Sequence, residues 1–173
     1  MSGGRFIIAN SLSLTAAFFM CLASMTGKRR RVYLYQFADC FFLMLAQLAF
    51  GYPASALMLA VGAVRNLLVS SAKYTKRLMT AFFILTVILS AISGGLFSIS
   101  ALALAATLLM TVAPIYARSL LSTKLFLLST QLLWVIYSLE IFDMATAISN
   151  GIAAIFAFIS VLKLALAARR AEH

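Results

Sequence analysis

Two residues of opposite charge give this sequence of 173 residues its clearest chemical signal. Asp39 lies six residues after Tyr33, and Arg65 lies six residues before Ser71, both within strongly apolar segments. If these segments are membrane helices, each charge is about 9 Å from a helix end, where an unpaired charge is costly. We therefore expect an ion pair between two neighbouring helices, which could also act as a gate. The alternative is that Arg65 reaches back to the membrane surface and Asp39 is hydrated near the end of its helix.

A second group of side chains could line a binding cavity. Gln36, Gln47, Asn66 and Gln131 lie within apolar segments, where a buried amide hydrogen-bonds either a solute or a neighbouring helix. Trp134 could stack on a ring-bearing solute, but an anchor at the membrane surface is the commoner role of a tryptophan near a helix end, and we favour it.

Residues for enzymatic or metal chemistry are scarce. The one histidine, His173, is the last residue of the sequence, and there is no His-Glu-x-x-His motif and no nucleophile with a neighbouring base. Cys21 and Cys40 lie in apolar segments and have neither a disulfide framework nor the spacing of metal ligands. We expect no catalytic residues, no metal and no cofactor.

The composition requires a lipid environment. With 64% hydrophobic residues, 10% charged residues and a mean hydropathy of +1.06, the chain has too few polar side chains to cover a water-soluble globule. The net charge of +10 comes from clusters between apolar segments, not from a basic stripe interleaved with aromatic residues. We therefore expect a lipid bilayer with anionic headgroups as the partner, and not nucleic acid.

The apolar segments predict an all-α, polytopic membrane protein with seven transmembrane helices. Each segment is close to the roughly 20 residues that cross a bilayer. The stretch from Leu78 to Ala117 carries no charge, and the turn residues Ser93, Gly94 and Gly95 divide it in two. The seven segments are Phe6–Met25, Val32–Phe50, Ala54–Ala72, Leu78–Ser93, Leu96–Ala117, Leu125–Leu139 and Met144–Ala168.

Basic residues occur in every second gap between these segments. The second and fourth gaps contain no charge, and the sixth contains only Glu140 and Asp143. By the positive-inside rule the odd gaps are cytoplasmic, which places the N-terminus outside and the C-terminus inside. The basic residues of the odd gaps are Lys28, Arg29, Arg30, Arg31, Lys73, Lys76, Arg77, Arg118 and Lys124, and the C-terminal end adds Lys163, Arg169 and Arg170.

Seven crossings are typical of two three-helix units that point the same way and are joined by one linker helix. We predict a first unit over residues 6–72, a linker helix over residues 78–93 and a second unit over residues 96–168, all in one membrane domain. Sliding the third segment by 89 positions places Ala56 on Ala145 and Gly62 on Gly151, which is a faint internal repeat.

Five short segments carry a resemblance to a known family. They are Gly27-Lys28-Arg29-Arg30-Arg31, Gly51-Tyr52-Pro53-Ala54, Gly62-Ala63-Val64-Arg65-Asn66-Leu67-Leu68, Trp134-Val135-Ile136-Tyr137 and Asn150-Gly151. These segments resemble the YgjV-type bacterial inner-membrane proteins. The similarity extends over nearly the whole chain and implies the cytoplasmic membrane of a bacterium as its location. That family is distantly similar to the SWEET, SemiSWEET and PQ-loop (MtN3-like) transporters, which implies three-plus-one-plus-three helices in parallel repeats.

The resemblance also implies roles for two residues. In SWEET-like proteins the third helix of each unit supplies a polar pocket residue, often Asn, and Asn150 fits that role. Its counterpart 89 positions earlier is Val61, an apolar departure from a symmetric pocket. Prolines placed like Pro114 serve as hinges in such transporters, although a tolerated kink is the commoner meaning of one proline in a helix.

Two functions from different classes remain open. The first is a small-solute transporter or facilitator that works by alternating access between the two units. The second is a non-transporting sensor, receptor or assembly module whose polar residues only pack helices. A polar central cavity favours the first, and a dry interface of Leu and Phe favours the second. The expected pocket residues are Asn150, Gln47, Gln131, Trp134 and Asn66, and the expected gate residues are Asp39, Arg65 and Pro114.

Overall fold

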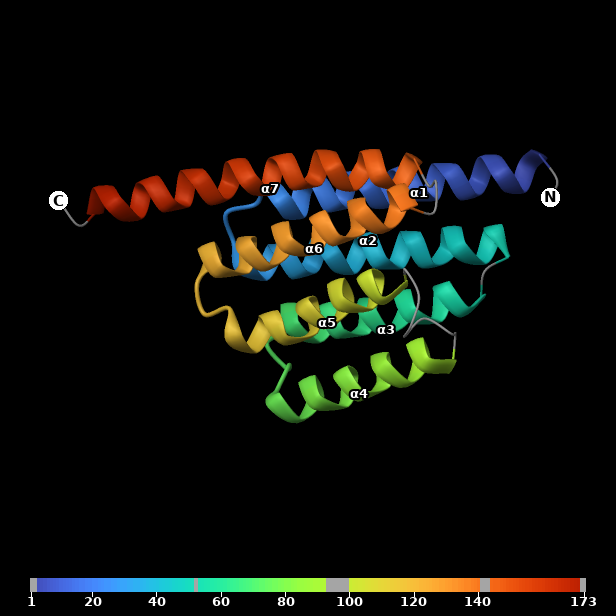
Figure 1. Ribbon diagram of the computed structural model, residues 1–173, viewed down its shortest axis with the longest axis horizontal. Helices are drawn as coiled ribbons and strands as arrows, with labels where there is room; N and C mark the ends of the chain where they lie inside the picture. Colours follow the sequence, from blue (N-terminus) through green and yellow to red (C-terminus); the bar gives the residue numbers. More distant parts are fainter. Residues whose placement is uncertain (1–2, 52, 93–99, 141–143, 172–173) are drawn as a thin grey trace.

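The computed structural model is all-helical and describes residues 3–51, 53–92, 100–140 and 144–171 (Figure 1). The predicted turn at 93–95, Asp143 and His173 lie outside these residues. The described residues form seven helices: α1 (Gly3–Met25), α2 (Arg29–Phe50), α3 (Pro53–Ser70), α4 (Lys76–Ile92), α5 (Ser100–Tyr116), α6 (Leu120–Glu140) and α7 (Met144–Ala171).

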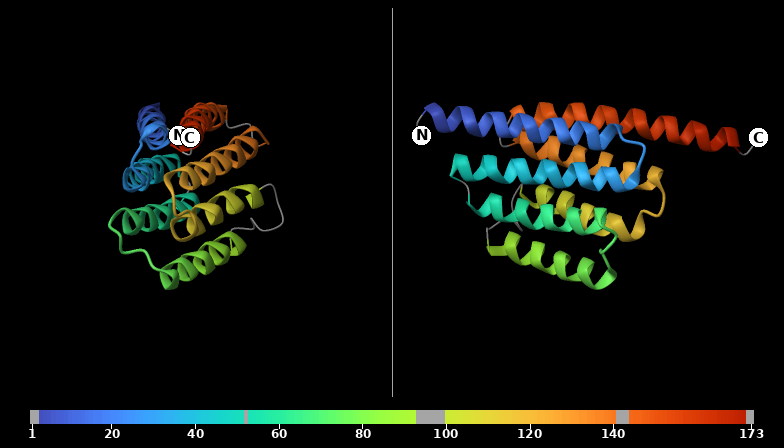
Figure 2. Two further views of the ribbon diagram at one scale, coloured as in Figure 1. Left: turned by 90° about the vertical axis from the view of Figure 1, so that its left-hand side faces the viewer. Right: turned by 180° about the vertical axis from the view of Figure 1, so that it is seen from behind.

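The helices form two rows. Seen along their axes in Figure 2, α1, α2 and α3 make one row, α7, α6 and α5 make the other, and α4 lies at one edge. Within the rows each helix packs on its sequence neighbour, while α1 lies against α7, α3 against α5, and α4 against both α5 and α3. Successive helices run in opposite directions, so the two chain ends lie at opposite ends of the bundle (Figure 1).

The alternating directions gather the basic residues at one end of the bundle. The ends of α1, α3 and α5 and the starts of α2, α4 and α6 meet there (Figure 1). We call this the basic end, because Lys28, Arg29, Lys76, Arg118 and Lys124 belong to these helix ends or the links between them.

Four of the helices are long and apolar enough to cross a membrane: residues 4–25, 29–50, 120–140 and 146–170. α3, α4 and α5 have 18, 17 and 17 residues. A helix of 17 residues is about 26 Å long, which is slightly less than a typical hydrocarbon core of about 30 Å.

Small side chains let the helices approach closely. On α1, Ala9, Ala16 and Ala23 are spaced by seven residues and are at most 1% exposed. On α7, Ala147 and Ala154 repeat this spacing and are also buried. Small residues at such intervals allow close backbone contact between membrane helices.

Large apolar side chains point outward instead. Ile7 is 67% exposed, Phe18 60% and Ile155 60%. A surface of this kind is unfavourable in water, and it is what lipid tails would cover.

Several helices begin earlier than the sequence predicts, and two of these starts matter for the site. α2 begins at Arg29 and not at Val32, and α6 begins at Leu120 and not at Leu125. At the start of α6 the Ser122 N–H donates to Ser119 Oγ at 3.0 Å and the Ser119 N–H donates to Ser122 Oγ at 3.1 Å. These bonds satisfy amide groups that a helix start leaves free. Lys124, expected in a loop, is therefore part of a helix.

Candidate functional site

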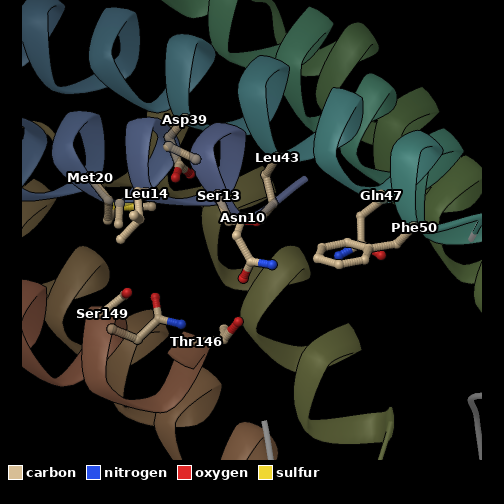
Figure 3. A pocket seen from close by; sticks show the side chains of 13 residues that line it. Asn10, Ser13, Leu14, Met20, Asp39, Leu43, Gln47, Phe50, Thr146 and Ser149 are labelled. Atoms are coloured by element: carbon tan, nitrogen blue, oxygen red, sulfur yellow. The ribbon is translucent and has the colours of Figure 1, made fainter. Parts of the chain in front are cut away.

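The larger of two neighbouring cavities has a volume of about 350 Å³ and lies between α1, α2 and α7 (Figure 3). Its walls come from the middle of α1, between Asn10 and Met20, from the second half of α2 and from the start of α7, so most of it lies away from the basic end. Its polar lining residues are Asn10, Ser13, Asp39, Gln47, Thr146, Ser149 and Asn150.

Asp39 is the one ionisable residue among those that line the larger cavity. Its side chain is 7% exposed, and Figure 3 shows its carboxylate turned toward the cavity. Across the described parts of the chain it forms no hydrogen bond and no salt bridge. A carboxylate at membrane depth is costly without a partner, and a cation in the cavity would offset that cost.

Four neutral polar side chains of this lining are also unengaged among the described residues. Ser13, Gln47, Ser149 and Asn150 form no side-chain hydrogen bond with any described residue. Asn10 donates its Nδ2–H to the Phe6 carbonyl of the preceding turn at 2.8 Å, which leaves its Oδ1 as an acceptor. Hydroxyl and amide groups from three helices thus converge on one space.

The smaller cavity, of about 130 Å³, lies between the two rows. Five residues line both cavities, so the cavities adjoin: Met20, Asp39, Leu43, Thr146 and Asn150. Other polar or aromatic residues line the smaller cavity alone: Gln36, Arg65, Asn66, Thr107, Thr130, Gln131 and Trp134.

Arg65 lies on the wall of the smaller cavity but is not paired with Asp39. Its guanidinium is 5% exposed and donates to Asn66 Oδ1 at 3.2 and 3.3 Å, to the Thr107 carbonyl at 3.1 Å and to Thr111 Oγ1 at 2.9 Å. The described residues show no salt bridge between Arg65 and Asp39. The expected direct ion pair is therefore not formed here, because neutral acceptors of α3 and α5 already surround the guanidinium.

Arg65 is buried, so its side chain does not reach back to the membrane surface, which was the alternative expected from the sequence. Tyr74, just beyond α3, donates its hydroxyl to the Thr111 carbonyl at 3.0 Å, on the same stretch of α5. Burial raises the pKa of Tyr74 to about 12, so this hydroxyl stays a neutral donor. Together these bonds fix α3 and the following link against α5.

Gln131 and Trp134 belong to the wall that α6 contributes. Gln131 is fully buried, and its Nε2–H donates to the Met20 sulfur of α1 at 2.9 Å. Trp134 contacts Tyr137 edge to face, with ring centroids 5.6 Å apart. The indole lines the smaller cavity, whereas the sequence favoured an anchor at the membrane surface.

The basic end of the bundle is closed by bonds between the rows. Lys124, which is 1% exposed, donates to the Ala23 and Ser24 carbonyls of α1, both at 2.6 Å. Arg29 of α2 donates to the Pro114 carbonyl of α5 at 2.5 Å. Carbonyls in the last turn of a helix lack helical partners and carry the negative end of the helix dipole, which explains why they bind cations. We call these two contacts the helix-end clamps.

An apolar plug lies beside the clamps. Tyr33 is 1% exposed and packs with Met110 and Ala113 of α5, against which Val69 and Phe126 also pack. The plug contains residues of α2, α3, α5 and α6, so it joins both rows.

The residues expected from sequence to form a pocket all line the two cavities. Gln47 lies on the larger cavity, Asn66, Gln131 and Trp134 on the smaller, and Asn150 on both. The three residues expected to form a gate do not lie together.

Asp39 lines both cavities and Arg65 lines the smaller one. The carbonyl of Pro114 accepts the hydrogen bond from Arg29 at the basic end. Sequence reasoning missed the clamps formed by Lys124, which is buried, and Arg29, which is half-buried. The Ser119-x-x-Ser122 cap was the signal that places Lys124 in a helix.

Comparison with known proteins agrees with this membrane architecture. No curated protein and no solved structure matches the chain. The family model Imp-YgjV, described as bacterial inner membrane protein, matches residues 7–168, so the chain belongs to this family of the bacterial inner membrane.

Proposed function

We propose that the protein moves a small solute across the bacterial inner membrane by alternating access between two three-helix units, α1–α3 and α5–α7, with α4 as the linker. The observation that carries this proposal is the pair of adjoining polar cavities beside a closed basic end. A module whose polar residues only pack helices would satisfy these groups with one another, yet several are left facing open space.

Two features support parallel repeats, the arrangement that SWEET-like transporters use. A two-fold rotation about the long axis of the bundle would carry α1 onto α5 and α3 onto α7, so it would exchange the α1–α7 contact with the α5–α3 contact. The same rotation would exchange the clamps, because α6 binds the end of α1 and α2 binds the end of α5. The Gly62 and Gly151 match adds little, since a Cβ added at Gly62 would meet the Cys40 sulfur at 3.5 Å, whereas one added at Gly151 would meet no other described part of the chain within 4 Å.

The clamps define which motion transport requires. With the N-terminus outside, as the basic residues indicate, the larger cavity lies in the outer half and the clamps close the cytoplasmic side. Release of a solute inward then needs both clamps and the Tyr33 plug to open. Rigid rotation of one unit against the other would break them together.

Solute flux from proteoliposomes tests the proposal. Liposomes containing the purified protein are loaded with a mixture of small anionic, neutral and cationic metabolites, and efflux is followed by mass spectrometry. At least one solute should leave faster than from protein-free liposomes.

Cavity filling provides the matched control. Ala17→Phe places a ring in the larger cavity and should abolish this flux, whereas Ala81→Phe on the exposed side of α4 should retain it. Equal flux from protein-free liposomes, or full flux in folded Ala17→Phe, would contradict the proposal.

A further inference from the structure

The larger cavity contains one carboxyl group, that of Asp39, and no cation of the described residues is paired with it. Arg65 lies on the smaller cavity alone, and its donors are taken up by Asn66, Thr107 and Thr111. Within the described residues no cation of the protein pairs with Asp39. A ligand that enters the cavity therefore gains most from carrying a positive charge of its own.

The groups around this charge suit a hydrogen-bond donor. Asn10 keeps its Oδ1 free, and Gln47, Asn150 and Ser149 can each offer an oxygen. An ammonium group carries three N–H donors and no acceptor. One N–H on Asp39 and the others on neighbouring oxygens would satisfy the ligand and the cavity at once.

The size of the cavity distinguishes an organic cation from a bare ion. A volume of about 350 Å³ is within the range of small-molecule sites, about 300–1,000 Å³, and is roughly ten times the share of one water molecule. Leu14, Leu43 and Phe50 supply apolar wall beside the polar groups. The cavity thus has a charged polar part and an apolar part.

From these observations we infer that the larger cavity binds small organic ammonium compounds, with Asp39 as the counter-ion and the apolar wall holding the body of the ligand. This assignment names the substrate class of the proposed transporter and in that sense rests on the proposed function. The binding itself can be measured without transport.

Ligands of one shape and different charge test the inference. The probes are cyclohexylammonium, cyclohexanol and cyclohexanecarboxylate, with sodium chloride as the inorganic cation, all in potassium phosphate buffer with the full chain in detergent. Thermal stabilisation reports binding, and the fluorescence of Trp134, the one tryptophan of the chain, provides a second readout. Cyclohexylammonium should raise the unfolding temperature most and change the fluorescence.

Two variants that each remove one negative charge separate the site from general electrostatics. Asp39→Asn should weaken cyclohexylammonium binding at least about tenfold, since a hydrogen bond to a charged group is lost. Glu140→Gln removes an exposed carboxylate at the end of α6 and should leave binding unchanged. Asp39→Asn should still fold, because removing an unpartnered buried charge relieves a cost.

The outcomes are distinct. If sodium alone stabilises the protein and Asp39→Asn abolishes this effect, the cavity binds a cation but the inference of an organic ligand is wrong. Equal binding of cyclohexanol, unchanged binding in Asp39→Asn, or no stabilisation by either cation would overturn the inference. Ammonium binding without flux in liposomes would support the binding site and contradict transport. Flux of neutral or anionic solutes that persists in Asp39→Asn would support transport and contradict the ammonium site.

Discussion

Arg65 is a buried charge that is satisfied by neutral groups. Its guanidinium donates to the amide oxygen of Asn66, the backbone carbonyl of Thr107 and the hydroxyl oxygen of Thr111. Hydrogen bonds to charged groups contribute about 1.5–3 kcal/mol each, so several of them can offset the cost of burying the cation. The residue then holds α3 to α5 and leaves Asp39 to the cavity.

A double-mutant cycle tests which residue Arg65 depends on. Arg65→Met and Thr111→Val should show a coupling energy of about 0.5–3 kcal/mol in thermal or chemical unfolding, because the two side chains share a bond. Arg65→Met combined with Asp39→Asn should be additive. Thr86→Val, a buried threonine of α4, provides the matched control for the threonine change. Coupling of Arg65 to Asp39 as strong as its coupling to Thr111 would show instead that the ion pair forms.

The sequence identifies the site residues better than their contacts. Asp39, Gln47, Gln131 and Asn150 stand out because a polar residue inside an apolar segment must face either a partner or a cavity. The acceptors of Arg65 could not be predicted, since one is a backbone carbonyl and the others are ordinary residues brought near by packing. Periodicity within one helix carries no information on which helix lies opposite.

The ends of the helices, at the next scale, hold the two rows together. Lys124 and Arg29 each come from the first turns of a helix in one row and bind the last carbonyls of a helix in the other. A helix end that is buried without partners is unfavourable. Each clamp therefore supplies a hydrogen-bond donor to carbonyls at a helix end and also closes the basic end.

Removal of one clamp should have a measurable cost. Lys124→Met keeps much of the length of the side chain but leaves the Ala23 and Ser24 carbonyls without their charged donor, so we expect the free energy of unfolding to fall by about 1.5–3 kcal/mol. Lys163→Met removes an exposed lysine of α7 and should change stability little. Equal effects of the two changes in thermal unfolding would show that the buried bonds contribute nothing.

Apolar segments predicted the seven helices but placed several of their starts too late, including those of α2 and α6. Hydropathy assigns basic residues to the gaps between helices, so Arg29 and Lys124 were read as loop residues. In the structure these two cationic side chains donate hydrogen bonds to backbone carbonyls of another helix. That compensation comes from tertiary packing, which hydropathy along one chain does not contain.

At the scale of the whole molecule, alternation of direction combines with the placement of charge. Every second helix end lies at the basic end, and the described opposite end carries little charge beyond Arg5 and Glu140. The basic end should therefore face the cytoplasm. The larger cavity, which lies in the other half, should then be open to reagents from the outside.

Cysteine labelling tests this orientation and the cavity together. In a Cys21→Ala and Cys40→Ala background, Ser119→Cys at the basic end should react with a membrane-impermeant thiol reagent only after the cells are opened. Ser149→Cys on the cavity wall should react in intact spheroplasts, because a thiol ionises and reacts where water reaches it.

Ile152→Cys, on the exposed side of the same helix, provides the control. Its thiol would face lipid and should react slowly from either side. Reaction of Ser119→Cys from outside would reverse the orientation. Equal protection of Ser149→Cys and Ile152→Cys would show that water does not enter the cavity, and a polar space sealed from both sides could not admit a solute in this conformation.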